Sequence, residues 1–209
     1  MAVTRAGRGI ARGVGRPAGQ PPKTDEEVRA AAANVFRRLG YRGTRMEDVA
    51  AELGLTKSSL YHYVATKEEL LFSILLDPYR EAIADLTTEV AGDAPPPVRL
   101  ARVLRRYFAN VAKYYPAISI YLAEGRRLPV PDGLRALDRE YVAGLRRLIV
   151  DGVRSGALRT ADPDVATAAI VGMCNQLAIR YDPHAGHDAQ QIADDLVQFV
   201  LHGLQAEGG

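Results

Sequence analysis

The sequence predicts an all-α protein with about nine helices. Apolar residues recur at intervals of three and four along most of the chain, which is the period of an amphipathic helix. Thr-x-x-Glu boxes begin at Thr24, Thr44 and Thr66, and such boxes start helices because each side chain satisfies a free backbone N–H group. No segment gives a convincing strand pattern, and we find no internal repeat.

The first helix is expected over residues 25–39 and is ended by Gly40. Six residues at helical spacing form its expected inner face: Val28, Ala31, Ala32, Val35, Phe36 and Leu39.

Residues 44–70 carry the strongest local pattern, two short helices joined by a tight turn and followed by a third helix start. Gly54 can take the left-handed conformation that ends a helix, and Thr56 starts the next helix at once, so the two axes cross sharply. Four apolar residues share one face of the first helix: Met46, Val49, Ala50 and Leu53. In the second helix Leu60 is expected in the core, and four residues are expected to face outward: Lys57, Ser58, Ser59 and Tyr61. This pattern is typical of a helix-turn-helix, which places its second helix in the major groove of DNA.

Between positions 24 and 72, a set of residues at fixed spacing matches a sequence pattern that is known from one protein family. They are Phe36, Gly40, Thr44, Val49-Ala50, Gly54-Leu55-Thr56, Ser59-Leu60-Tyr61-His62-Tyr63 and Lys67-Glu68-Glu69-Leu70. The pattern resembles the N-terminal domain of the TetR family of bacterial transcription regulators. The resemblance implies an all-helical homodimer that usually works as a repressor on a palindromic operator in double-stranded DNA. It also implies release from DNA when a small ligand binds the C-terminal domain.

Prolines and glycines divide the remaining chain into six further expected helices. Asp162 and Asp188 are the expected caps of the last two, and residues 92–97 form the clearest linker. The six helices are expected over residues 67–90, 98–115, 116–127, 132–155, 162–181 and 188–205.

Charge and composition suggest three segments. Residues 1–22 contain four arginines without an acidic residue, and they predict a disordered basic arm that either contacts DNA or has no role. Residues 23–72 form the expected DNA-binding domain, and residues 73–209 the ligand-binding and dimerisation domain. Residues 1–75 hold twelve basic and eight acidic residues, whereas residues 76–209 hold fifteen and seventeen. The positive excess therefore falls on the half that would bind phosphates, although a chance fluctuation would give the same small difference.

The expected DNA contacts follow from the start of the second helix and from the resemblance. Lys57 can donate to guanine O6 and N7, whereas short hydroxyl side chains specify bases weakly. Lys67 lies at a helix start that suits a phosphate, or else faces solvent, and Thr44 serves equally well as a plain helix cap. The resemblance implies that Tyr61 and His62 touch phosphates. The full set is Arg42, Thr44, Arg45, Thr56, Lys57, Ser58, Ser59, Tyr61, His62, Tyr63 and Lys67.

An effector pocket is expected among apolar and tyrosine-rich helices of the C-terminal half, although each segment would also suit an ordinary core. The expected lining is Tyr107, Tyr114, Ile118, Tyr121, Leu122, Arg126, Tyr141, Leu145, Met173 and Leu177. Residues 120–129, followed by Arg139-Glu140-Tyr141, resemble a branch of the family that senses coenzyme A thioesters in fatty-acid or steroid breakdown. That resemblance implies an acyl-CoA effector, with arginines at the mouth of the pocket for its phosphates. The arginines are Arg105, Arg106, Arg126, Arg127, Arg146 and Arg147, and a solvated helix face is the alternative for each pair.

The chain also departs from that branch. It has no tryptophan, and residues 180–186 differ from the loop common there. A regulator of drug efflux that senses a hydrophobic or cationic compound is therefore the alternative. Acidic residues in the pocket would favour this alternative, and Glu124 is the candidate for such a residue.

The last two helices are expected to form the dimer surface, where the family places its contact, or else to pack only within the subunit. The expected contacts are Ala166, Ala169, Ile170, Ile192, Leu196, Phe199 and Val200.

Several other classes of protein are disfavoured. The single cysteine, Cys174, permits no intrachain disulfide and suits the cytoplasm, and no apolar run approaches the roughly 20 residues of a membrane helix. His184 and His187 fall in a loop with Asp182 and Asp188, and we interpret it as a polar loop and not as a metal site. No phosphate loop or nucleophile motif is present, so we expect neither an enzyme nor a cofactor. A DNA-coating protein would need more positive charge.

Overall fold

The computed structural model describes residues 22–204, except for the side chain of Arg126. This part of the chain contains nine α-helices and no β-strand, which confirms the predicted fold class. The predicted basic arm lies outside the described residues. The helices are α1 (Asp25–Gly43), α2 (Met46–Glu52), α3 (Lys57–Leu60), α4 (Lys67–Ala91), α5 (Pro96–Lys113), α6 (Ala117–Glu124), α7 (Asp132–Arg154), α8 (Pro163–Arg180) and α9 (Ala189–Leu204), with 3-10 turns at Gly125–Arg127 and Pro183–Ala185.

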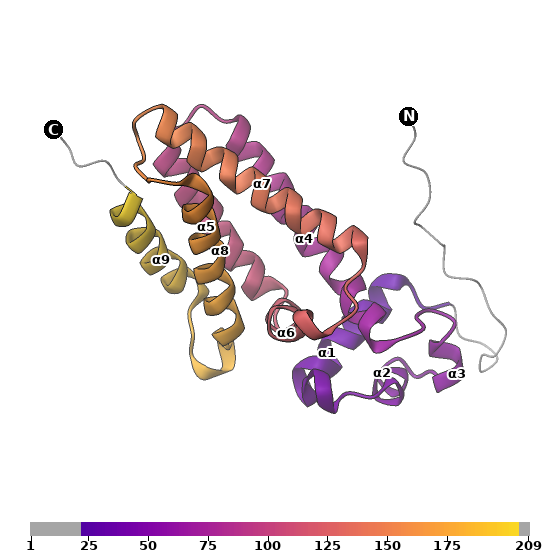
Figure 1. The fold of residues 1–209 in the computed structure, drawn as a ribbon. Coiled ribbons are helices and arrows are strands. Elements are labelled where there is room, and N and C mark those ends of the chain that lie inside the picture. Colours follow the sequence, from indigo (N-terminus) through magenta and orange to yellow (C-terminus); the bar gives the residue numbers. More distant parts are fainter. Residues whose placement is uncertain (1–21, 205–209) are drawn as a thin grey trace, which may run out of the picture. The chain divides into compact units, whose positions relative to one another are not determined.

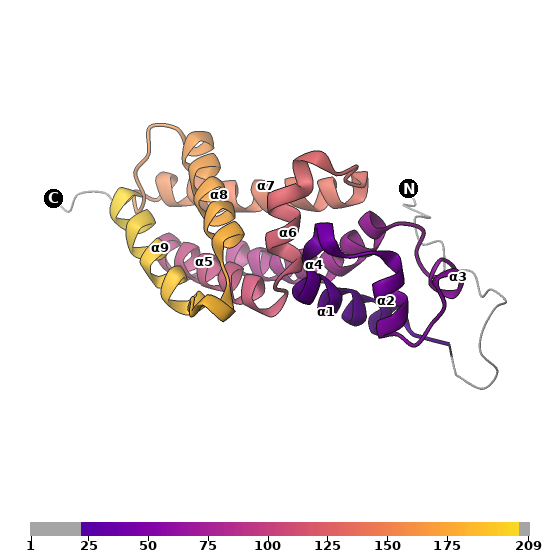
Figure 2. The same ribbon diagram turned by 90° about the horizontal axis from the view of Figure 1, so that it is seen from below.

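The chain divides into two compact units, one up to Ile74 and one from Leu75 onward. Helices α1 to α3 and the start of α4 form the first unit (Figures 1 and 2). Its core consists of apolar residues that the helical period predicts, with Phe36 and Leu60 almost completely buried. Leu39 was expected in this core but is 44% exposed. Gly40 has a φ of 70°, and beyond this kink Tyr41 packs against Phe36 in its place, with ring centroids 5.4 Å apart.

Two of the three predicted capping boxes stabilise helix starts. At Thr24 the box is complete, because Thr24 Oγ1 accepts from the N–H of Glu27 and Glu27 Oε2 accepts from the N–H of Thr24. At Thr66 the hydroxyl accepts from the N–H of Glu69, whose carboxylate accepts from the N–H of Ala65.

The predicted box at Thr44 is wrong. Arg45 precedes α2, and its N–H donates to the carboxylate of Asp48 at 2.8 Å. Thr44 is buried, and its hydroxyl donates to the carbonyl oxygen of Gly40 at 2.7 Å. The kink at Gly40 places this carbonyl beside the hydroxyl, so Thr44 closes the end of α1 and does not cap α2.

The second unit is a helical bundle in which α5 packs against α7, α8 and α9, and α8 packs against α6 and α7. Helices α5, α8 and α9 lie side by side in both ribbon views (Figures 1 and 2). Its core draws on long apolar side chains of these helices, among them Leu104, Phe108, Leu148 and Ile149. No helix of the described chain is long and apolar enough to cross a bilayer.

Candidate functional site

The helix-turn-helix is formed by α2, the turn Leu53-Gly54-Leu55 and α3. Gly54 has a φ of 66°, as the turn requires, and the N–H of Leu55 donates to the carbonyl of Ala50 at 2.8 Å. Thr56 caps α3 by accepting from the N–H of Ser59 at 3.2 Å. Seven of the predicted DNA contacts are exposed on this unit: Arg42, Arg45, Thr56, Lys57, Ser58, Tyr61 and His62.

Ser59 does not face outward as expected. It is 6% exposed, and its hydroxyl lies 2.9 Å from Thr56 Oγ1. Both the N–H and the hydroxyl of Ser59 contact the capping hydroxyl of Thr56, so the side chain lies against the start of α3 and not on its outer face. Thr44 is also buried, whereas Tyr63 is half-buried and its hydroxyl accepts from the N–H of Lys23.

Lys57 forms an ion pair with Glu47 of α2, with Nζ 2.5 Å from Oε1. The hydrogen bond that Lys57 donates to Glu47 raises the pKa of Lys57 and lowers the pKa of Glu47. Both side chains are about half exposed. A base contact by Lys57 would therefore replace an existing and solvent-screened ion pair.

Lys67 braces the first unit from within. Its Nζ donates to the carbonyl oxygens of Tyr41 at 2.7 Å and Thr44 at 3.0 Å, and it lies 4.4 Å from the ring centroid of Tyr41. Tyr41 in turn donates its hydroxyl hydrogen to Glu68. These contacts give Lys67 a structural role that the sequence did not indicate.

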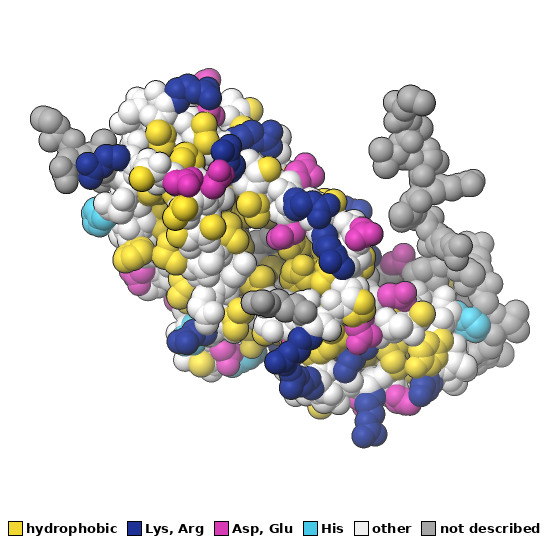
Figure 3. Space-filling view, viewed as in Figure 1, with side chains coloured by type: hydrophobic (Ala, Val, Ile, Leu, Met, Phe, Trp, Pro, Cys, Tyr) yellow, Lys and Arg dark blue, Asp and Glu magenta, His cyan; other side chains and the backbone are white. Residues whose placement is uncertain are grey.

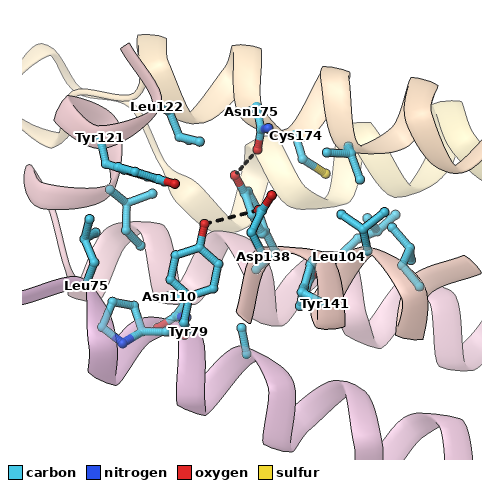
Figure 4. Close-up of a pocket in the computed structure, with 17 residues that line it drawn as sticks. Leu75, Tyr79, Leu104, Asn110, Tyr121, Leu122, Asp138, Tyr141, Cys174 and Asn175 are labelled. Atoms are coloured by element: carbon cyan, nitrogen blue, oxygen red, sulfur yellow. Dashed lines mark hydrogen bonds between the residues drawn. The ribbon is translucent and has the colours of Figure 1, made fainter. Parts of the chain in front are cut away.

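The second unit contains a pocket between α4, α5, α6, α7 and α8 (Figure 4). About 740 Å³ of space lies between its side chains, with the open solvent at its mouth included. The lining is mostly apolar, with four tyrosines. It comprises Leu75, Pro78, Tyr79, Ala82, Leu104, Tyr107, Asn110, Ile118, Tyr121, Leu122, Asp138, Tyr141, Val142, Leu145, Val171, Cys174 and Asn175.

Two hydrogen bonds order the polar groups of this pocket (Figure 4). Tyr79 of α4 donates to Asp138 Oδ1 of α7 at 3.2 Å, and Tyr107 of α5 donates to Asn175 Oδ1 of α8 at 3.0 Å. Burial raises the pKa of both hydroxyls and of Tyr141, and it raises the pKa of the Cys174 thiol to about 12. All four groups are therefore protonated at neutral pH.

Six of the ten predicted ligand contacts line the pocket: Tyr107, Ile118, Tyr121, Leu122, Tyr141 and Leu145. Tyr114 does not, because its hydroxyl donates to Glu81 on the surface of the unit. Met173 and Leu177 pack against the core instead. The side chain of Arg126 lies outside the described part of the chain. The lining residues of α4 and α8, together with Leu104, Asn110, Asp138 and Val142, were not predicted.

The arginines proposed for a phosphate-binding mouth are absent from the described lining. Arg105 pairs with Asp194 at 2.6 Å, Arg106 with Asp85, and Arg146 with Asp164. Glu124 does not line the pocket, and Asp138 is the acidic residue that does.

The loop after α8 uses its polar side chains internally. The N–H of Asp182 donates to His187 Nδ1 at 3.1 Å, and Asp182 Oδ1 accepts from the N–H of His184. Among the residues that the structure covers, no cluster of His, Cys, Asp or Glu could hold a metal ion.

Comparisons with known proteins identify both units. Residues 28–74 match the family described as bacterial regulatory proteins, tetR family, and residues 93–204 match the family described as tetracyclin repressor-like, C-terminal domain. The chain belongs to the TetR family. It is a ligand-responsive DNA-binding repressor.

Relatives within the TetR family extend over nearly the whole chain. The HTH-type transcriptional repressor KstR2 of Mycobacterium tuberculosis is 27% identical over 92% of this chain and 98% of its own. A solved structure titled as the ketosteroid transcriptional regulator KstR2 of that organism has a TM-score of 0.75 at 25% identity, covering 91% of this chain and 99% of the other. A structure of AibR in complex with isovaleryl coenzyme A and operator DNA has a TM-score of 0.70 at 27% identity, covering 84% and 96%.

The predicted dimer residues of this TetR-family chain fall into two groups. Ala166, Ile170, Leu196 and Val200 are buried in the core of the second unit, which contradicts their assignment to an intersubunit surface. They occupy the inner faces of α8 and α9. Ile192 is half-buried, whereas Ala169 and Phe199 are exposed.

Proposed function

We propose that two copies of this chain bind a palindromic operator, each with α3 in a major groove, and leave it when a small hydrophobic effector fills the pocket. The observation that carries the proposal is the mostly apolar pocket of the second unit in a chain whose first unit exposes a helix-turn-helix. A two-fold operator needs a two-fold protein, which supports a homodimer. The regulatory family supports binding, and not catalysis, as its role.

An acyl-CoA thioester is the first candidate effector. The AibR structure holds isovaleryl coenzyme A, and the apolar lining of the present pocket suits an acyl chain. The described lining offers no lysine or arginine, so the phosphates of coenzyme A would lie outside the pocket.

A hydrophobic or cationic compound is the second candidate. Asp138 favours it, because a carboxylate in a pocket attracts positive charge and repels negative charge. Regulation of efflux genes would suit such an effector.

The test is fluorescence anisotropy on the DNA that flanks the chain's own gene. Short- and long-chain acyl-CoAs, their free acids and hydrophobic amines are added to the complex. Release by any of these compounds supports the proposal, and the compound that acts distinguishes the two candidates. Equal affinity for flanking and random duplexes at moderate ionic strength would contradict the operator-binding role.

Two variants separate base contact from phosphate contact. Lys57→Ala is expected to relax preference at one base pair. Arg45→Ala is expected to weaken binding to cognate and random DNA alike and to lower the salt slope by about one. Equal losses on both DNAs for Lys57→Ala would contradict the base contact.

A further inference from the structure

The polar groups of the pocket are unevenly divided between donors and acceptors. Tyr79 and Tyr107 direct their hydroxyl hydrogens to Asp138 and Asn175, so these two donors are already used. Asn110 Nδ2 donates to the carbonyl of Pro78 at 2.8 Å, whereas the Oδ1 of the same side chain is buried and lacks a hydrogen-bond partner. Because that oxygen has almost no accessible surface, a ligand cannot reach it, and the acceptor that the pocket offers beside these bonds is the Asp138 carboxylate.

Asp138 carries the formal charge among the described lining residues, and it is exposed, so it lies where the pocket meets solvent. It lies on α7 opposite Tyr79 of α4, and the Tyr79 hydroxyl points to its Oδ1 (Figure 4). A carboxylate accepts several hydrogen bonds, so Asp138 can receive a ligand donor in addition to Tyr79.

A carboxylate ligand would meet an unfavourable field in the same place. Tyr141 could donate to it, but a neutral hydroxyl does not compensate an anion that is moved from water onto an apolar lining beside another anion. The raised pKa of Tyr79, caused first by burial and then by Asp138, shows the same preference against negative charge.

We propose that the pocket selects an apolar effector that carries a hydrogen-bond donor, a hydroxyl or a protonated amine, which Asp138 accepts, and that it rejects a carboxylate. This inference rests on the proposed effector role of the pocket. It also fits a hydroxylated acyl chain whose charged part stays outside.

The experiment is isothermal titration calorimetry of the full chain at pH 7 with three probes of equal apolar length, used below their micelle concentrations. The probes are decylamine, 1-decanol and decanoate. We expect decylamine and decanol to bind, and decanoate to bind at least tenfold more weakly than decylamine. Decanoate binding as tight as that of decylamine, or no binding by any probe, overturns the inference.

Two variants isolate the carboxylate. Asp138→Asn keeps an acceptor for Tyr79 and removes the charge, so decylamine affinity should fall about fivefold while decanoate affinity rises. Glu140→Gln removes an exposed charge two residues away on α7, outside the pocket lining, and should change neither. Equal effects of the two variants overturn the assignment to Asp138. If Asp138→Asn does not fold, the ranking of the three probes on the unaltered chain still decides.

DNA release is measured separately with the same probes. Binding in the expected order without release leaves the inference intact and contradicts the proposed function. Release by decanoate in preference to decylamine contradicts the inference and leaves the proposed function intact.

Discussion

At the scale of single residues, Lys67 shows how one cation can organise a DNA-binding unit. Its ammonium group donates to the carbonyls of Tyr41 and Thr44, so it joins the start of α4 to the last turn of α1 and to the residue that follows it. Hydrogen bonds from a charged donor contribute more than neutral ones. Lys67→Met should remove both and destabilise the first unit by about 1–3 kcal/mol. Hydrogen exchange of peptides from residues 22–74 measures this loss.

Arg38→Met is the matched control, because it removes an exposed ion pair with Glu52. Such pairs contribute about 0–1 kcal/mol, so its exchange should change little. A phosphate-binding Lys67 gives the opposite result. The salt slope of DNA binding would then fall by about one while exchange in the first unit stays unchanged.

At the scale of helices, close packing at the end of α7 depends on Gly152. After α7 the chain turns back, with a φ of 74° at Gly156, and the N–H of Leu158 donates to the carbonyl of Gly152 at 2.9 Å. A Cβ at position 152 would lie 2.4 Å from Leu158 Cδ1, and Leu158 is buried. Gly152→Ala should therefore lower stability by about 1–3 kcal/mol, although alanine favours helix.

Thermal unfolding followed by circular dichroism measures this effect. Gly133→Ala serves as its control, because a Cβ there meets no atom within 4 Å. We expect that variant to be neutral or slightly stabilising. A melting temperature for Gly152→Ala at or above that of the unaltered chain would show that Leu158 moves aside at little cost.

Helix positions in this chain were predictable, because local chemistry fixes them. Asp162 accepts from the N–H groups of Asp164 and Val165 at the start of α8, as its place before Pro163 indicates. Asp188 likewise accepts from the N–H of Gln190 at the start of α9.

The sides that helices present to one another were less predictable. Asp138 is exposed, as expected for the polar face of α7, yet it also lines the pocket, because α7 packs beside α5 and Tyr79 of α4 donates to it. Ile170 and Leu196 suit a core and a dimer contact equally well, since both need apolar residues at helical spacing. Only the arrangement of the helices decides whether such a residue lies in the core or in a dimer contact.

At the scale of the whole molecule, the apolar residues left exposed on α8 and α9 indicate where a second copy would bind. Phe199 is 69% exposed and Val165 is 64% exposed, and hydrophobic side chains reach the surface over these helices (Figure 3). Large apolar side chains gathered on one face commonly mark protein interfaces.

Phe199→Asp would place a charge in such an interface without altering the core, so it should shift the chain from dimer to monomer in sedimentation velocity. Because one subunit reaches only one half-site, operator affinity should fall by more than tenfold. Val98→Asp is the control, since Val98 is 42% exposed at the start of α5 and should leave the dimer unchanged. A Phe199→Asp chain that remains dimeric at the same concentration would place the interface elsewhere, and a monomeric chain that keeps full operator affinity would remove the need for two-fold binding.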